Sequence, residues 1–141
     1  MSYLIDTNVI SELRKGRRCN RSVADWFAAI PEDEVFLSVL TIGELRRGIS
    51  LLQRRDKEAA AALNRWLLGL ADASQDRILG VDRAIAEEWG RMNSPNPLPV
   101  IDSLIAATAK VHGLTVATRN TIDIARTGVI CVNPFERSKS L

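Results

Sequence analysis

The N-terminal stretch YLIDTNVI, residues 3–10, decides the fold. Its first three residues are apolar and form a run short enough for a buried strand, and Asp6 follows directly at the carboxyl end of that run. Apolar residues at helical spacing then continue until shortly before Gly16. The stretch therefore predicts a buried strand, an acidic residue at its end and a short helix after it.

The same alternation of strand and helix patterns continues along the chain. Further short apolar runs, which predict strands, lie at 35–38, 78–81, 114–117 and 129–132. Between them, helices are expected over 22–30, 41–52, 56–70, 82–92, 100–111 and 121–126. Strands that alternate with helices indicate βαβ units and a parallel sheet, so we expect a single α/β domain over residues 1–141.

Length and composition are those of one ordinary globular domain. The 141 residues are 46% hydrophobic and 26% charged, which excludes a disordered or fibrous chain. The N-terminus lacks the basic start and apolar stretch of a secretory signal, and no apolar run approaches the roughly 20 residues that span a bilayer. We therefore expect a cytoplasmic protein that does not interact with membranes.

The scarcity of cysteine and histidine restricts the possible chemistry. Cys19 and Cys131 are too few for a disulfide framework, and the single His112 excludes zinc sites that need several Cys or His ligands. Catalysis by a Ser-His-Asp or Cys-His set would require His112, which we expect at the wrong end of a helix. A bound metal would therefore have oxygen ligands.

Four carboxylates occupy comparable places in this layout. Asp6 follows the first strand, Glu44 lies in the first helical turn after the second, Asp102 lies at a helix start and Asp123 lies just beyond the fourth strand. In a parallel sheet these positions meet at the carboxyl edge, where ligands bind. Because crowded carboxylates repel one another, they need a compensating cation, and Mg²⁺ or Mn²⁺ prefers such oxygen ligands.

Each acid also has a structural explanation. Asp6 could be a turn residue, Glu44 could be the capping-box partner of Thr41, and Asp123 could be a solvated helix residue. Asp102 differs because its neighbours are apolar, and a buried acid without a partner is costly there. The sequence favours a functional role most clearly at Asp102.

Positive charge is concentrated in one segment, although 19 basic and 17 acidic residues give the chain a formal net charge of only +2. Residues 11–21 contain five basic side chains and one acidic side chain. This segment predicts a patch that faces phosphate groups, the alternative being a solvated basic loop. Its basic residues are Arg14, Lys15, Arg17, Arg18 and Arg21.

Four separated motifs carry a family resemblance that extends over nearly the whole chain. They are LIDTNVISE at 4–12, SVLTIGEL at 38–45, IDSLIAA at 101–107 and ATRNTID at 117–123. Together, and in this order, they resemble a PIN domain. More narrowly, the chain resembles the VapC-type ribonuclease toxins of bacterial type II toxin–antitoxin pairs, including the FitB-like branch.

The resemblance implies a three-layer α/β/α domain with about five parallel strands and a Mg²⁺- or Mn²⁺-dependent endoribonuclease activity. It assigns Asp6 and Asp102 as the principal metal ligands and Glu44 as the acid that completes the core and orients water. Asp123 matches the more variable fourth acid, a place that Asn120 could also fill. The polar residues that the resemblance puts around the site are Thr7, Asn8, Thr118 and Asn120.

The resemblance also implies partners. A VapC-type toxin forms a homodimer, is inhibited by a small VapB/FitA-like antitoxin, and binds promoter DNA only through that antitoxin. The apolar helix positions between 51 and 70 could form a groove for a partner helix, with core packing as the alternative. For the RNA substrate, the expected backbone contacts are Arg14, Lys15, Arg17 and Arg18, and Arg46 or Arg119 are further candidates.

Two other functions fit parts of the sequence. A haloacid-dehalogenase-like phosphatase would use Asp6 as its nucleophile, but that pattern requires a second Asp where Asn8 stands. A non-catalytic module with the same fold would bind a partner without cleaving it, although a binding surface gains nothing from clustered carboxylates. The last residues, about 136–141, are expected to form a flexible tail.

Overall fold

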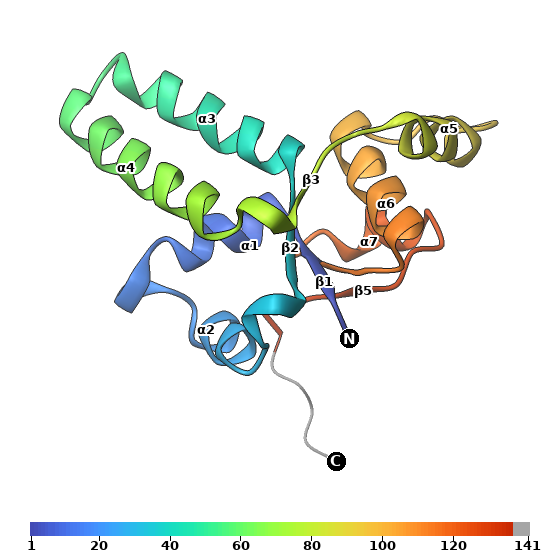
Figure 1. Cartoon of the computed structure of the whole chain (residues 1–141), viewed down its shortest axis with the longest axis horizontal. Coiled ribbons are helices and arrows are strands. Elements are labelled where there is room, and N and C mark those ends of the chain that lie inside the picture. The colour runs from blue at the N-terminus through green and yellow to red at the C-terminus, as the bar shows by residue number, and fades with distance from the viewer. Residues whose placement is uncertain (137–141) are drawn as a thin grey trace.

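A five-stranded sheet forms the centre of the computed structural model, which describes residues 1–136 (Figure 1). All strand pairs are parallel, and the order across the sheet is β3-β2-β1-β4-β5. The predicted parallel sheet is therefore confirmed. The strands are β1 (Tyr3–Ile5), β2 (Val35–Ser38), β3 (Ile78–Leu79), β4 (Thr115–Ala117) and β5 (Cys131–Val132).

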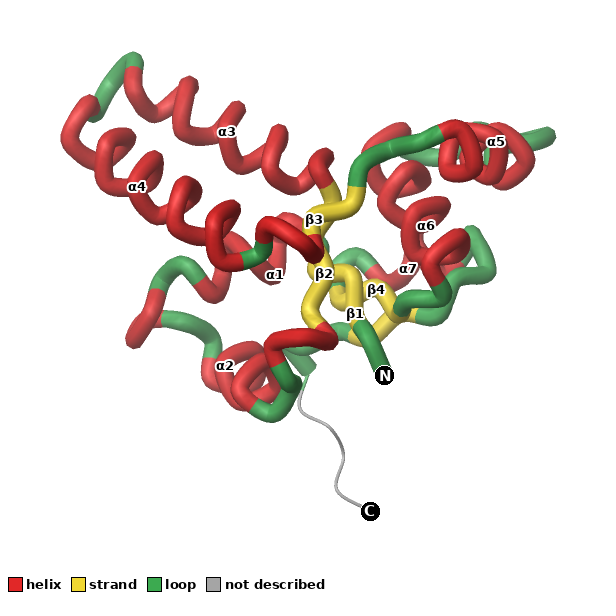
Figure 2. Tube along the Cα trace, viewed as in Figure 1, coloured by secondary structure: helices red, strands yellow, loops and turns green. Residues whose placement is uncertain are grey.

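Helices cover both faces of the sheet and make the expected three layers. In Figures 1 and 2, α1, α2 and the α3–α4 pair lie on one side of the strands, and α5, α6 and α7 lie on the other. All the helices expected from the sequence are present. They are α1 (Thr7–Leu13), α2 (Arg21–Ala28), α3 (Val39–Gln53), α4 (Lys57–Ala73), α5 (Arg83–Met92), α6 (Val100–His112) and α7 (Thr121–Ala125).

Successive strand residues pack into two separate cores because side chains alternate between the faces of a sheet. Leu4 pairs with Val116 in the sheet, and both belong to the core cluster that includes residues of α6 and α7. The next pair, Ile5 and Ala117, belongs to the cluster formed with α1 and α2. Since both faces are covered, the central strands are largely apolar, with Thr115 in β4 and Ser38 at the end of β2 as exceptions.

The capping box predicted at Thr41 and Glu44 is wrong. The helix begins earlier, at Val39, and Ser38 is its N-cap because the Ser38 hydroxyl accepts a hydrogen bond from the Leu40 N–H at 3.0 Å. The last residue of β2 thus starts α3 directly. Glu44 consequently lies in the second helical turn, and its carboxylate does not cap the helix that carries it.

Other helix ends follow the sequence signals. Asp82, where the sequence predicts the start of this helix, caps α5 by accepting from the Ile85 N–H at 3.0 Å. Gly113 ends α6 with φ at +67°, a left-handed conformation that glycine adopts without a Cβ clash. The two short strands β3 and β5 span two residues each, fewer than their apolar runs suggested.

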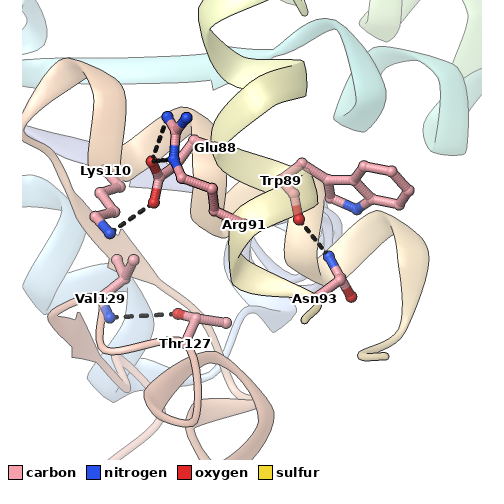
Figure 3. A network of polar contacts seen from close by, with 7 residues as sticks. All are labelled: Glu88, Trp89, Arg91, Asn93, Lys110, Thr127 and Val129. Atoms are coloured by element: carbon pink, nitrogen blue, oxygen red, sulfur yellow. Dashed lines mark hydrogen bonds and ion pairs between the residues drawn. The ribbon is translucent and has the colours of Figure 1, made fainter. Parts of the chain in front are cut away.

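Charged side chains join α5 to α6 on the outer side of the molecule (Figure 3). Glu88 on α5 forms ion pairs with Lys110 on α6 at 2.6 Å and with Arg91 at 2.9 Å. The indole N–H of Trp89 also donates to the Ser103 hydroxyl at 3.0 Å. The contact of Trp89 with Ser103 attaches the start of α6, where Asp102 lies, to α5, and the pair of Glu88 with Lys110 attaches its last turn.

Two remaining expectations concern the tail and the membrane. The tail expected over 136–141 lies outside the described residues, apart from Glu136. Among the described residues, no helix is long and apolar enough to cross a bilayer.

Candidate active site

The order of the strands creates the site. From β1 the chain proceeds to β2 on one side, whereas β4 pairs with β1 on the other side. Ligands of parallel sheets bind beyond the carboxyl ends of strands at such a switch point. Asp6 follows β1 there and Thr118 follows β4, so the predicted meeting of strand-end residues is found.

Asp6 is buried among hydrogen-bond donors. Its carboxylate is in a residue only 4% exposed, and it accepts from the Thr7 N–H at 2.8 Å and the Thr118 hydroxyl at 2.8 Å. The Asn8 amide donates to the same oxygen as Thr118, at 3.3 Å. Burial raises the pKa of Asp6, the negative charge of Glu44 raises it further, and the three hydrogen bonds counteract part of this.

Thr7 connects Asp6 to the acid on α3. Its backbone N–H binds Asp6, and its hydroxyl donates to Glu44 Oε1 at 2.6 Å. The same hydroxyl lies 3.3 Å from the hydroxyl of Thr41, which is completely buried. Glu44 is therefore oriented by α1 across the end of the sheet, although its residue is exposed.

Asp102 and Asp123 share one amide donor. Asn120 Nδ2 donates to Asp102 Oδ2 at 2.9 Å and to Asp123 Oδ2 at 3.0 Å. Burial raises the pKa of Asp102, and the negative charges of Asp6 and Asp123 raise it further, whereas the hydrogen bond from Asn120 lowers it. The four predicted acids therefore form one electrostatic group around β1, β4 and the first turn of α6.

Positive charge is scarce inside this group. Within residues 1–136, no Lys or Arg nitrogen lies within ion-pair distance of Asp6, Glu44 or Asp102, and Asp123 has only Arg126 at 3.8 Å. No protein cation in this part of the chain therefore offsets the repulsion that raises the pKa of Asp6 and Asp102.

A divalent cation fits this chemistry. The available donors are carboxylate, hydroxyl and amide oxygens, which Mg²⁺ and Mn²⁺ prefer. No three Asp, Glu, His or Cys side chains of the described part of the chain already converge as a complete ligand set. Mg²⁺ keeps several of its waters and commonly uses only one or two carboxylates, so the open arrangement of Asp6 and Asp102 suits it.

The basic segment borders the site on one side. Arg14, Lys15 and Arg18 are exposed and line a cavity of about 590 Å³. Arg14 also lines a second groove, of about 250 Å³, together with Thr7 and Glu44. Arg17 is exposed but lines neither cavity, so the structure connects three of the four predicted phosphate contacts to the site or to each other.

Some polar residues near the site were not found by sequence reasoning. Thr41 was interpreted as a cap and instead meets Thr7, and Glu12 is buried on α1, with 9% exposure, beside Lys15. Only the helical phase of α1, in which Glu12 shares the buried side with Val9, could have indicated its burial. His112 ends α6, at the opposite end from Asp102, as expected.

The fold and this acidic edge define a class of protein: the chain belongs to the PIN-domain family, whose model matches residues 3–129. Among its relatives, it is 35% identical to the toxin FitB of Neisseria gonorrhoeae over 137 residues, covering 94% of this chain and 97% of that protein. It is 33% identical over 138 residues to the VapC ribonuclease Y4jK of Sinorhizobium fredii, with 94% and 97% coverage.

Solved structures lead to the same family. The chain matches the crystal structure of FitAcB from Neisseria gonorrhoeae with a TM-score of 0.87 and 34% identity, over 94% of this chain and 98% of that one. It matches the structure of FitAB bound to an IR36 DNA fragment with a TM-score of 0.87 and 32% identity, over 96% and 97% of the two chains. The predicted resemblance to PIN-domain toxins is therefore confirmed.

Proposed function

We propose that this chain is the toxin of a type II toxin–antitoxin pair and acts as a Mg²⁺- or Mn²⁺-dependent endoribonuclease. The observation that carries the proposal is the group of Asp6, Glu44, Asp102 and Asp123 at the switch point of the sheet, in which, among the described residues, only Asp123 has an ion-pair partner, Arg126. Similarity to a toxin and to a VapC ribonuclease supports the reaction class.

Asp6 and Asp102 would hold the cation, because burial raises the pKa of both carboxyls and a nearby positive charge would stabilise their ionised forms. When bound, a divalent cation supplies positive charge for the phosphate and lowers the pKa of water. Thr118 and Asn8 keep Asp6 in one orientation by donating to its Oδ2. A carboxylate held in this way needs little reorganisation during the reaction.

Glu44 would orient the attacking water. The Thr7 hydroxyl holds one of its oxygens at 2.6 Å and leaves the other available. Asn120 would position Asp102 and Asp123 relative to each other, since it donates to both. No side chain needs to act as a nucleophile, which agrees with the acidic and amide side chains that meet beyond β1 and β4.

The partners follow from the relatives. The chain matches one chain of the FitAcB structure and one chain of the FitAB structure, and that FitAB is bound to a DNA fragment. We propose that this chain forms a homodimer, is inhibited by a VapB/FitA-like antitoxin and reaches promoter DNA only in that complex. A toxin that cleaves cellular RNA would act in the cytoplasm.

The test is cleavage of labelled single-stranded and transfer RNA by the purified chain in Mg²⁺, Mn²⁺ or EDTA. Cleavage should require the metal, and both Asp6→Asn and Asp102→Asn should abolish it. Asp33→Asn removes an exposed acid that lies outside the site and should retain the activity of the unaltered protein. Equal cleavage by the unaltered protein and either site variant would refute the proposal, and so would full activity in EDTA.

The two other candidate functions, a phosphatase and a non-catalytic binding module, predict different results. A phosphatase with Asp6 as nucleophile would form an acid-stable phosphoaspartate, which a nuclease that uses water as nucleophile would not form. A non-catalytic module would bind a partner with equal affinity in the Asp6→Asn variant and never cleave RNA. Mapping the 5′ ends of RNA after induced expression would separate both from the nuclease and identify the substrate.

A further inference from the structure

Arg119 lies between two residues of the site, Thr118 and Asn120, but carries the opposite charge. Its backbone N–H donates to Asn8 Oδ1 at 3.0 Å, which fixes the start of its side chain beside Asp6. Its guanidinium carbon lies 3.7 Å from the centre of the Phe135 ring. The residue is nevertheless exposed, so the guanidinium can still bind a ligand from solvent.

The Phe135 ring makes this cation unusually well placed. Phe135 is partly buried and packs against the core cluster under α1 and α2. A guanidinium over an aromatic face is attracted by the ring and loses part of its rotational freedom before any ligand arrives. Binding of a phosphate to this arginine therefore costs less conformational entropy than binding to a freely moving arginine.

Glu12 connects Arg119 to the basic segment. Its carboxylate is buried and lies 3.0 Å from Lys15 Nζ. The hydrogen bond from Lys15 is the largest cause that lowers the pKa of Glu12, and the charge of Arg119 also contributes. One carboxylate thus lies within electrostatic reach of two cations, and a positive charge remains for a ligand.

We propose that Arg119 is a phosphate-binding residue for the RNA backbone, and that the strand continues from it over the cavity lined by Arg14, Lys15 and Arg18. Phe135 is a positioning residue that acts through Arg119. This inference rests on the proposed ribonuclease function and adds the direction in which the substrate leaves the acidic edge. Because the acids repel a polyanion, a cation next to them must hold it.

The competing explanation is purely structural. In that case the stacking of Arg119 on Phe135 only attaches the segment after β5 to the loop after β4. Removing either side chain would then lower the melting temperature without changing how the protein binds RNA. The two explanations differ in the salt dependence of binding, because only a phosphate contact releases counterions.

The experiment measures binding of a fluorescent single-stranded RNA to the full chain in EDTA, at several salt concentrations. Arg119→Ala should weaken binding about tenfold and reduce the slope of log K against log salt by about 0.7, the value for one phosphate contact on a single strand. Arg119→Lys should retain the slope. Phe135→Leu should also retain the slope but weaken binding, because the charge remains and its placement is lost.

Arg83→Ala is the matched control, since it removes another exposed arginine, on α5 and far along the chain from the basic segment. It should leave affinity and slope unchanged. An Arg119→Ala slope equal to that of the unaltered protein would overturn the inference, and so would an unaltered protein that binds no RNA. Cleavage in Mg²⁺ is measured separately: its failure, with the binding pattern intact, would refute only the ribonuclease.

Discussion

Two shielded carboxylates in different elements of the molecule have opposite electrostatics. Glu88 joins α5 to α6, its side chain is 12% exposed, and ion pairs with Lys110 and Arg91 lower its pKa. Asp6 is 4% exposed, has hydrogen-bond donors but no cation among the described residues, and its pKa is raised by burial. Ion pairs thus compensate the charge of Glu88, which supports the structure, whereas no ion pair among the described residues compensates the charge of Asp6 at the site.

The largest effect should be on catalysis. Asp102→Asn should reduce metal-dependent RNA cleavage by more than about 100-fold, beyond the range typical of a residue that only supports a ligand. Glu88→Gln, also a loss of one shielded charge, should change the rate constant little. Rates measured under single-turnover conditions check this, and a similar loss in both variants would remove the distinction between the two carboxylates.

Divalent cations should stabilise the protein through the uncompensated acids. At a Mn²⁺ concentration 100-fold above Kd, the free energy of unfolding should rise by about 2.7 kcal/mol. The increase should be absent in Asp102→Asn and unchanged in Glu88→Gln. Thermal unfolding with and without Mn²⁺ measures it, and an equal increase in Asp102→Asn would place the cation elsewhere.

Removing repulsion should stabilise the metal-free protein. In Asp102→Asn the new amide oxygen can still accept from Asn120, while the repulsion by Asp6 and Asp123 disappears. We expect a gain on the order of 1 kcal/mol after solvent screening, which is a rise in Tm of about 3 °C. Differential scanning calorimetry in EDTA at pH 7.5 measures it, and a lower Tm would show that Asp102 is a structural acid.

The stability gain expected in Asp102→Asn should depend on pH, and the raised pKa of Asp102 sets the direction of that dependence. Because the pKa of Asp102 is raised above its value of 3.8, the folded state binds more protons than the unfolded state, and this carboxyl destabilises the fold as pH rises through the carboxyl range. The advantage of Asp102→Asn should therefore be present at neutral pH and shrink in acid. An advantage that is constant with pH would point to packing.

The smallest effect should come from Glu88, whose pKa is lowered first by Lys110 and then by Arg91. Its stabilising contribution is present above the unfolded pKa and is lost as pH falls through the folded value. Glu88→Gln should lower Tm at neutral pH by less than Asp102→Asn raises it. Glu87→Gln is the matched control, because its partner Arg83 is 90% exposed; an equal decrease in the control would make the Glu88 contacts unimportant.

The sequence predicts the sheet and its acidic edge because each depends on local patterns. Short apolar runs followed by polar residues mark the strand ends, and parallel pairing then brings Asp6 and Thr118 to one edge of the sheet, where the first turn of α6 adds Asp102. The link from Thr7 to Glu44 was not predictable, since it depends on how α3 leaves the sheet at Ser38. The two hydrogen bonds that the Asn120 amide donates were not predictable either, since they depend on the relative placement of α6 and α7.

The connections at the carboxyl edge also limit what can vary around it. Only Asp6 separates β1 from α1, and β2 passes into α3 with no residue between Ser38 and Val39. An inserted residue at either junction would rotate or shift the helix that carries Thr7 or Glu44 relative to the sheet. This fold therefore cannot acquire new target preferences by lengthening these two turns. Surface substitutions and the distant α3–α4 loop remain open to diversification.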